Sequence, residues 1–253
     1  MTGRDLQGTT TIVTGASRGF GRAVASALVG AGAQVVGLAR DRARLEKVGA
    51  ELGEGFTPIA ADATDPVVAG ELLDLYHPAT LVLNAGASPL PRPLQRQTWE
   101  TFSRNWEVDV QQVFNWTREA LLLPLPPDST VIAFSSGAAL AGSPLSGGYA
   151  GAKATIRFIT RYANDESKRG GLRIRLTSVL PGLTAATELG SPAVAAYARR
   201  EGVEPAEYVA ARGWTLTTEQ VGASILQLAT DPGLDADAYR ITPDGLAPVP
   251  GPA

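Results

Sequence analysis

The 253-residue sequence contains no cysteine and only one histidine, His77. The lack of cysteine excludes disulfides, thiolate metal sites and a cysteine nucleophile. A single histidine excludes a metal site built from several histidines, so we expect no metal site. Runs of lysine and arginine are also missing, and the formal net charge is -3. We therefore expect no nucleic-acid partner.

Long hydrophobic runs are missing as well. No apolar stretch approaches the length of a membrane span, and residues 1–8 lack the apolar core of a signal peptide. We therefore expect a cytoplasmic location and no membrane partner. The chain does have apolar content, with 44% hydrophobic and 19% charged residues. This balance is typical of a chain that buries a substantial core.

Strand-like runs alternate with segments of helical periodicity along the whole chain. The seven strand-like runs are residues 10–13, 34–38, 57–61, 80–83, 130–134, 173–179 and 238–241. This alternation predicts βαβ units and a mostly parallel sheet with helices on both faces. We expect a single doubly wound, Rossmann-type α/β domain over residues 1–253, with seven strands. A small helical flap is expected at about residues 183–213, and an extended C-terminal tail at about 243–253.

The first expected strand leads directly into a glycine-rich turn, TGASRGFG, at residues 14–21. Such a turn before a helix lets the backbone approach a pyrophosphate, and the helix N-terminus supplies free N–H groups. The spacing differs from GxGxxG, but the position at the first strand–helix junction predicts a dinucleotide cradle. The expected cofactor-binding members are Gly15, Ser17, Arg18, Gly19, Phe20 and Gly21.

The end of the second expected strand predicts which dinucleotide is bound. An acidic residue there would bond the ribose hydroxyls and repel a 2′-phosphate, but the sequence has Ala39 and Arg40. Arg40 offers a guanidinium group suited to phosphate, and Arg18 approaches the same phosphate from the glycine turn. This pattern predicts NADP(H) as cofactor. The alternative is a solvated arginine at each position, with Arg40 paired to Asp41.

Tyr149 and Lys153 are four residues apart and therefore share one face of a helix. A free tyrosine, with a pKa of about 10, exchanges protons poorly near neutrality. A nearby ammonium group favours the phenolate and brings the tyrosine closer to a working acid and base. This spacing alone is common on exposed helices. Ser136, at the end of the preceding strand, strengthens the prediction of an active site.

In this order the motifs resemble those of the short-chain dehydrogenase/reductase family, over nearly the whole chain. They are the glycine turn, Asp62-Ala63, Asn84-Ala85-Gly86, Ser136, the YAGAK segment 149–153 and Pro181-Gly182. The resemblance implies an NADP(H)-dependent oxidoreductase that interconverts a ketone or aldehyde and an alcohol by hydride transfer. In that scheme the cofactor carries the hydride chemistry and Tyr149 is the general acid and base.

The resemblance also implies a role for each matching residue. Ser136 would bond the substrate oxygen, with Ser135 as the neighbouring alternative, and Lys153 would also bind the nicotinamide ribose beside Tyr149. The other implied cofactor contacts are Asp62 and Ala63 at the adenine, Asn84, Ala85 and Gly86 at the ribose and nicotinamide side, and Pro181, Gly182 and Leu183 at the nicotinamide. The family's usual threonine is Ala186 here. Thr187 or Thr184 is therefore left to bond the carboxamide.

A second departure concerns the catalytic residues. The family normally carries an asparagine on its long central helix, whereas the matching segment 106–110, WEVDV, has Asp109. A carboxylate there would stabilise the charged Lys153 and oppose phenolate formation at Tyr149. We expect a changed pH profile. If the alignment is shifted, Asn105 or Asn115 would take that place.

Two other functions compete with this interpretation. The first is an NADP(H)-binding sensor or scaffold with little turnover, for which Asp109 is the only support. The second is a hydrolase with Ser136 as nucleophile. Only His77 could act as its base, and no GxSxG elbow surrounds Ser136.

Candidate lining residues predict a moderately apolar small-molecule substrate. They are Leu140, Leu145, Leu183, Leu189 and Tyr197; the alternative is that they pack under the flap. The resemblance further implies a homodimer or homotetramer, paired through helices at about 98–123 and 149–167.

Overall fold

The computed structural model describes residues 3–213 and 215–250. Its sheet has the strand order β3-β2-β1-β4-β5-β6-β7-β8, and every pair is parallel except β7 with β8. The strands are β1 (Thr10–Thr14), β2 (Gln34–Ala39), β3 (Phe56–Ala60), β4 (Thr80–Leu83), β5 (Thr130–Phe134), β6 (Arg175–Pro181), β7 (Ala238–Thr242) and β8 (Gly245–Pro248). The α/β class and the mostly parallel sheet are as predicted.

The eighth strand corrects the predicted count of seven. Gly245, with a φ of 114°, closes a tight turn after β7. The chain then folds back antiparallel, so that Leu246 lies opposite Ile241. The sheet therefore ends in two edge strands, β3 on one side and β8 on the other. Of the predicted extended tail, residues 251–253 lie outside the described residues.

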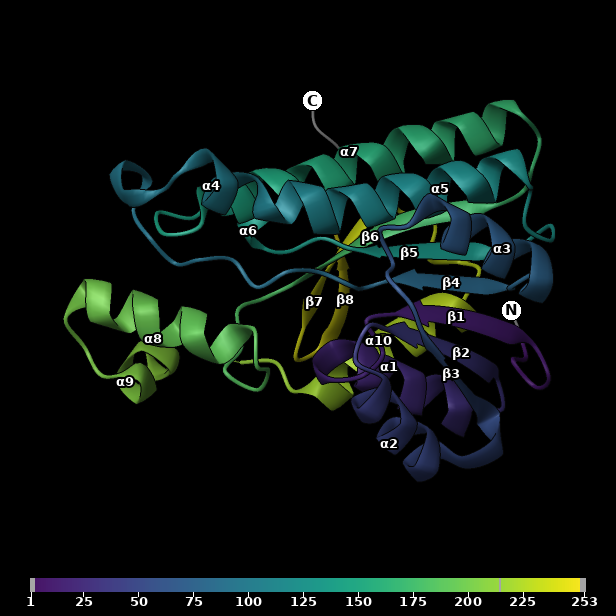
Figure 1. Cartoon of the computed structure of the whole chain (residues 1–253), viewed down its shortest axis with the longest axis horizontal. Helices are drawn as coiled ribbons and strands as arrows, with labels where there is room; N and C mark the ends of the chain where they lie inside the picture. The colour runs from purple at the N-terminus through teal and green to yellow at the C-terminus, as the bar shows by residue number, and fades with distance from the viewer. Residues whose placement is uncertain (1–2, 214, 251–253) are drawn as a thin grey trace.

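Helices cover both faces of the sheet (Figure 1). Helices α1, α2 and α10 lie on one face, and α3, α5 and α7 lie on the other. The helices are α1 (Gly19–Gly30), α2 (Arg42–Leu52), α3 (Pro66–Tyr76), α4 (Trp99–Asn105), α5 (Gln111–Leu122), α6 (Ala138–Ala141), α7 (Gly147–Arg169), α8 (Gly190–Glu201), α9 (Pro205–Ala210) and α10 (Thr218–Thr230). Short 3₁₀ turns occupy Gly53–Gly55 and Leu94–Arg96.

The core is divided into two layers by the sheet. Successive residues of β1 point to opposite faces, so Ile12 packs with Trp116 of α5, while Val13 packs with Leu28 of α1. All five residues of β5 are buried. A central parallel strand covered on both faces has this uninterrupted apolar character.

The helix starts differ in how their free N–H groups are satisfied. Asp41 accepts a hydrogen bond from Arg44 N at the start of α2, and Thr98 and Thr217 form capping boxes on α4 and α10. The side chain of Arg18, the N-cap of α1, makes no such bond. The first N–H groups of α1 therefore remain open to an anionic ligand.

Two segments build the walls of the site. The long helix expected at 98–123 is interrupted between α4 and α5 by a π-helical turn, Trp106–Val110, a feature often found at functional sites. The flap consists of α8 and α9, which stand away from the sheet in Figure 1. They pack on each other through Val194, Ala198 and Tyr208.

Candidate active site

A cavity of about 490 Å³ lies at the carboxyl ends of the central strands. Strand order reverses between β1 and β4, and open α/β sheets bind ligands at such a switch point. All of the predicted catalytic and cofactor-binding residues line this cavity except Gly21 and Ser136. Segments from seven parts of the chain therefore converge on one volume of the size typical of ligand sites.

Two glycines of the turn, Gly15 and Gly21, leave no room for larger residues. Gly15 has a φ of 70°, and a Cβ there would lie 2.8 Å from Asn84 Nδ2. Gly21 lines no part of the cavity, but a Cβ at Gly21 would lie 2.2 Å from Gly15 O. Gly21 therefore acts through packing beneath the turn. A bare backbone turn beside the open start of α1 fits the pyrophosphate of a dinucleotide.

Thr14 fixes this turn to the end of β4. Its hydroxyl accepts hydrogen bonds from the backbone N–H groups of Asn84 at 2.9 Å and Ala85 at 3.0 Å, and it donates to Gln112 Oε1 at 3.0 Å. The Asn84 amide in turn donates to the carbonyl oxygens of Thr14 and Gly15. The two strand ends that border the switch point are thus held in one network.

The adenosine end of the cavity is lined by three arginines. Arg18 and Arg40 were predicted there, and the structure adds Arg44 from α2. Arg44 Nη1 lies 2.9 Å from Glu188 Oε1, and Arg18 contacts the same carboxylate. Asp41 caps α2 and lies 3.3 Å from Arg44 Nε. Sequence analysis missed Arg44 and Glu188, because contacts between residues so distant in the chain leave no local pattern.

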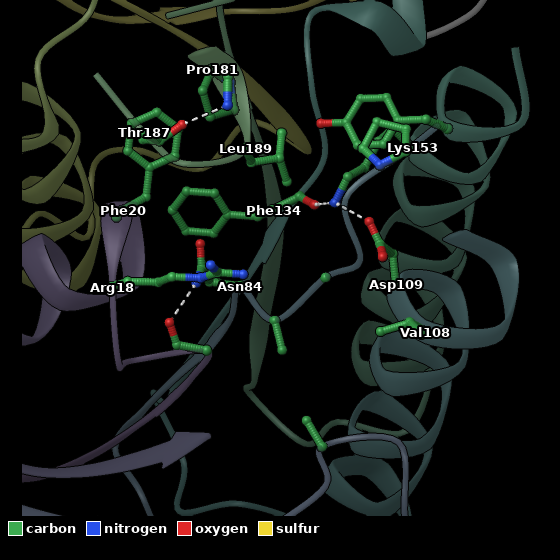
Figure 2. A pocket seen from close by; sticks show the side chains of 18 of the residues that line it. Arg18, Phe20, Asn84, Val108, Asp109, Phe134, Lys153, Pro181, Thr187 and Leu189 are labelled. Carbon is green, nitrogen blue, oxygen red and sulfur yellow. Dashed lines mark hydrogen bonds and ion pairs between the residues drawn. The ribbon is translucent and has the colours of Figure 1, made fainter. Parts of the chain in front are cut away.

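The reacting end is built around Lys153, which is buried in the second turn of α7. Its Nζ donates to Phe134 O at 2.9 Å, and it lies 3.0 Å from Asp109 Oδ2 and 5.5 Å from the centre of the Tyr149 ring. Figure 2 shows Lys153 held between the Phe134 carbonyl and Asp109. The Asp109 contact is an ion pair between two buried side chains.

Burial alone would lower the pKa of Lys153, but the Asp109 carboxylate, followed by Tyr149, more than offsets it. The pKa of Lys153 is therefore raised above its usual value. Lysine stays fully charged at neutral pH despite being in the interior. A permanent positive charge is thus kept beside the Tyr149 ring.

Asp109 is held by its own surroundings as well as by the lysine. Its Oδ1 accepts a hydrogen bond from Ala87 N at 2.7 Å. Asn105 donates to Ala87 O at 2.7 Å, and Asn115 donates to Thr64 O. The residue in contact with Lys153 is therefore Asp109, and neither asparagine takes that place.

The two candidate serines differ in position. Ser135 is buried, and its hydroxyl donates to Lys153 O at 2.7 Å. Ser136 Oγ accepts a hydrogen bond from Ala138 N at 3.2 Å and does not line the cavity. Its role in binding the substrate oxygen stays a prediction.

The predicted carboxamide ligands also differ. Thr184 is buried and donates to Leu216 O at 2.6 Å, whereas Thr187 Oγ1 accepts a hydrogen bond from Gly190 N at 2.9 Å. Both line the cavity. Thr187 keeps its hydroxyl proton available, so it remains the better candidate to bond a carboxamide oxygen.

Of the five predicted substrate-lining residues, Leu183, Leu189 and Tyr197 line the cavity, and Leu140 and Leu145 do not. Across residues 3–213 and 215–250, acidic and histidine side chains form no cluster of three or more that could hold a metal ion. In the same described part of the chain, no helix is both long enough and apolar enough to cross a membrane.

The chain matches known proteins in sequence and in structure. Residues 9–198 match the family model described as short chain dehydrogenase. A probable NADP-dependent dehydrogenase of Haemophilus influenzae is 28% identical over 197 residues, covering 74% of this chain and 75% of that protein. Serine 3-dehydrogenase of Agrobacterium fabrum is 32% identical over 186 residues, covering 69% of this chain and 71% of that protein.

Among solved structures, the 3-ketoacyl-(acyl-carrier-protein) reductase of Brucella melitensis, complexed with NADH, superposes with a TM-score of 0.76. That match covers 93% of this chain and 97% of the reductase at 22% identity, and so supports the fold. The family match extends over most of the chain and includes the glycine turn, Tyr149 and Lys153. The chain therefore belongs to the short-chain dehydrogenase/reductase family and is an oxidoreductase that uses a nicotinamide cofactor.

Proposed function

We propose that the protein is an NADP(H)-dependent oxidoreductase that interconverts a ketone or aldehyde and an alcohol, with Tyr149 as general acid and base. One observation carries this proposal. A single cavity joins an arginine-lined end, suited to a phosphorylated ribose, to Tyr149 and the buried Lys153–Asp109 pair. The distance between the two ends is bridged by the glycine turn and by Asn84, which fit the middle of a dinucleotide.

When bound, the nicotinamide would supply or accept the hydride at the substrate carbon. The chain would contribute placement and proton transfer. Gly15, Ser17 and the open start of α1 would hold the pyrophosphate, and Lys153 and Tyr149 the nicotinamide ribose. Pro181 and Thr187, on the opposite wall, would orient the nicotinamide ring.

Tyr149 would complete the reaction at the substrate oxygen. In reduction, its hydroxyl gives a proton to the oxygen as the carbon receives the hydride; in oxidation, the phenolate takes that proton back. The charged Lys153 Nζ, 5.5 Å from the ring, supports the phenolate electrostatically. Asp109 opposes that effect, since its carboxylate is in direct contact with the same ammonium group.

The preference for NADP(H) rests on charge. Arg18, Arg40 and Arg44 line the cavity where β2 ends, and Ala39 leaves no carboxylate at that strand end to bond ribose hydroxyls. The name of the Haemophilus influenzae relative, a probable NADP-dependent dehydrogenase, supports the same preference. The substrate we expect is a small, moderately apolar carbonyl compound, held by Leu183, Leu189 and Tyr197.

The test is NADPH oxidation, followed by absorbance, against a panel of ketones and aldehydes. NADH is run in parallel, and Tyr149→Phe serves as the control. We expect turnover with NADPH, weaker turnover with NADH, and loss of about 10²–10⁴-fold in rate in the mutant. An equal rate for the wild type and Tyr149→Phe would contradict the proposed role of the tyrosine.

A binding protein with little turnover is the second candidate. Ser136 outside the cavity lining and a carboxylate against Lys153 are the observations that favour it. Tight NADPH binding without turnover across the panel would support this candidate. If the protein hydrolysed activated esters and did not oxidise NADPH, the hydrolase alternative would be supported instead.

A further inference from the structure

Glu188 joins two parts of the molecule that are far apart in the sequence. It lies in the segment between β6 and α8, where the flap begins. Its two carboxylate oxygens lie 2.9 and 3.1 Å from Arg44 Nη1, and one of them also contacts Arg18 Nη1. A single carboxylate thus bridges the glycine turn and α2. Glu188 lies outside the cavity lining, in an adjoining hollow that Arg18 and Arg44 also line.

The two bridged arginines belong to the set expected to bind the cofactor's 2′-phosphate. Both line the cavity together with Arg40. Carboxylate and phosphate are both oxyanions that accept hydrogen bonds from a guanidinium group in the same planar geometry. Hydrogen bonds from Arg44 and Arg18 hold the pKa of the Glu188 carboxyl below its usual value. At neutral pH, Glu188 is therefore a full anion that engages the guanidinium groups of Arg18 and Arg44.

We propose that Glu188 is a specificity-determining residue that competes with the 2′-phosphate of NADP(H) for Arg18 and Arg44. The proposal rests on the NADP(H) preference argued above. When the phosphate takes the two guanidinium groups, Glu188 is displaced and the segment leading into the flap is released. NAD(H), which has no 2′-phosphate, leaves the Glu188 bridge in place. The flap thereby responds to the identity of the cofactor.

The ion pairs that Glu188 makes with Arg18 and Arg44 are weak enough for another anion to replace them. The side chains of Arg18, Arg44 and Glu188 are 52%, 48% and 56% exposed, and ion pairs between such exposed groups are weak. A phosphate carries up to two negative charges and three acceptor oxygens. The phosphate therefore outcompetes a single carboxylate for the same pair of arginines.

Displacement of Glu188 would reach the flap through Thr187. The Thr187 hydroxyl accepts a hydrogen bond from Gly190 N at 2.9 Å, and its carbonyl accepts one from Ser191 N at 2.9 Å. Gly190 is tightly packed, since a Cβ there would lie 1.9 Å from Thr184 O. Figure 2 shows Thr187 on the same side of the cavity as Arg18, opposite Lys153. The first turn of α8 is thus tied to the residue next to Glu188.

The experiment compares two nucleotides that differ only in the 2′-phosphate: adenosine 2′,5′-bisphosphate and adenosine 5′-monophosphate. Binding of each to the full chain is measured by calorimetry for the wild type, Glu188→Gln and Glu51→Gln. Glu51 is the matched control because it also pairs with an exposed arginine, Arg22, close to the same arginines. Amide hydrogen exchange of the segment 185–190 is measured for each complex.

We expect Glu188→Gln to tighten bisphosphate binding about fivefold, the effect of removing one exposed ion pair, and to leave monophosphate binding unchanged. Glu51→Gln should change neither affinity by as much as twofold, because Glu51 pairs with Arg22 and not with Arg18 or Arg44. In the wild type, the bisphosphate should raise exchange in the segment 185–190 and the monophosphate should not. In Glu188→Gln, exchange there should already be high without a nucleotide.

Two results would overturn the proposal, and they are distinguishable. If the wild type prefers the bisphosphate but Glu188→Gln and Glu51→Gln change its affinity equally, the effect is one of net charge and Glu188 has no special role. If the wild type binds both nucleotides equally, the NADP(H) preference itself fails, and the role of Glu188 fails with it.

Discussion

The two ends of the cavity hold carboxylates against cations in opposite surroundings. At the reacting end, the side chains of Asp109 and Lys153 are 1% and 7% exposed. At the adenosine end, those of Glu188 and Arg18 are 56% and 52% exposed. The buried pair cannot separate without leaving an unpaired charge in the interior, whereas the exposed pair exchanges freely with water or another anion. A carboxylate–cation pair is therefore a permanent part of the structure at the reacting end, and a contact that another anion can replace at the adenosine end.

The largest expected effect is on stability, when the buried pair is broken. Lys153→Met leaves Asp109 unpaired in the core, so we expect the free energy of unfolding to fall by about 3–5 kcal/mol. Lys47→Met on the exposed surface of α2 is the control and should change it by no more than about 0.5 kcal/mol. Urea denaturation measures both. Adding Asp109→Leu to Lys153→Met should recover stability; no recovery would mean that the ion pair is not the cause.

The next effect is on the pH profile. The Asp109→Asn substitution removes a negative charge that opposes the Tyr149 phenolate. We therefore expect the rise in the rate of alcohol oxidation with pH to occur about one pH unit lower than in the wild type. Glu107→Gln is the control, because Glu107 lies in the same π-helical turn but faces Ser103 and solvent. The measurement is the rate as a function of pH for all three proteins. Superimposable curves for the wild type and Asp109→Asn would remove this role of Asp109.

The raised pKa of Lys153 also makes the stability of the fold depend on pH. A group whose pKa is higher in the folded than in the unfolded chain contributes stability below its unfolded value, about 10.4 for lysine, and loses it as pH rises through the folded value. We therefore expect the wild type to exceed Asp109→Asn in stability by a constant margin near neutral pH. That margin should shrink at strongly alkaline pH. If the stability difference between the wild type and Asp109→Asn grew with pH, the raised pKa of Lys153 could not be its cause.

Removing an exposed arginine at the adenosine end of the cavity should affect cofactor binding more than the stability of the fold. Arg44→Gln should weaken NADPH binding about tenfold, because a charge-assisted hydrogen bond is lost, and leave NADH binding unchanged. The free energy of unfolding should change by less than about 1 kcal/mol. Arg42→Gln, on the same helix and paired with Glu46, is the control. Equal losses for the two variants would locate the phosphate elsewhere.

The smallest expected effect is that of salt. Exposed charges are screened beyond about 8 Å at physiological ionic strength, so added salt should weaken NADPH binding to the arginines about two- to threefold. NADH binding should change less. Fluorescence titration at low and physiological ionic strength measures both. The same salt dependence for both cofactors would argue against a phosphate contact at these arginines.

Sequence reasoning reached the buried end of the cavity more completely than the exposed end. Tyr149, Lys153 and Asp109 lie in strongly patterned segments and line the cavity, whereas Ser136, predicted with them, does not. The bridge from Glu188 to Arg44 was missed because exposed ion pairs between distant residues follow no periodicity. The eighth strand was missed because prolines in 243–250 predict an extended tail, and only the turn at Gly245 brings it back to the sheet.

The two edges of the sheet bear on how the protein behaves at high concentration. An exposed strand edge offers a row of unpaired backbone groups that can join the sheet of another molecule. Here, β3 contains Pro58 and β8 ends in Pro248, and proline has no N–H to donate. Both edge strands of the sheet thus carry a proline that interrupts their row of backbone N–H donors. We expect this arrangement to keep concentrated samples free of the edge-to-edge aggregates that a sheet with unbroken margins would form.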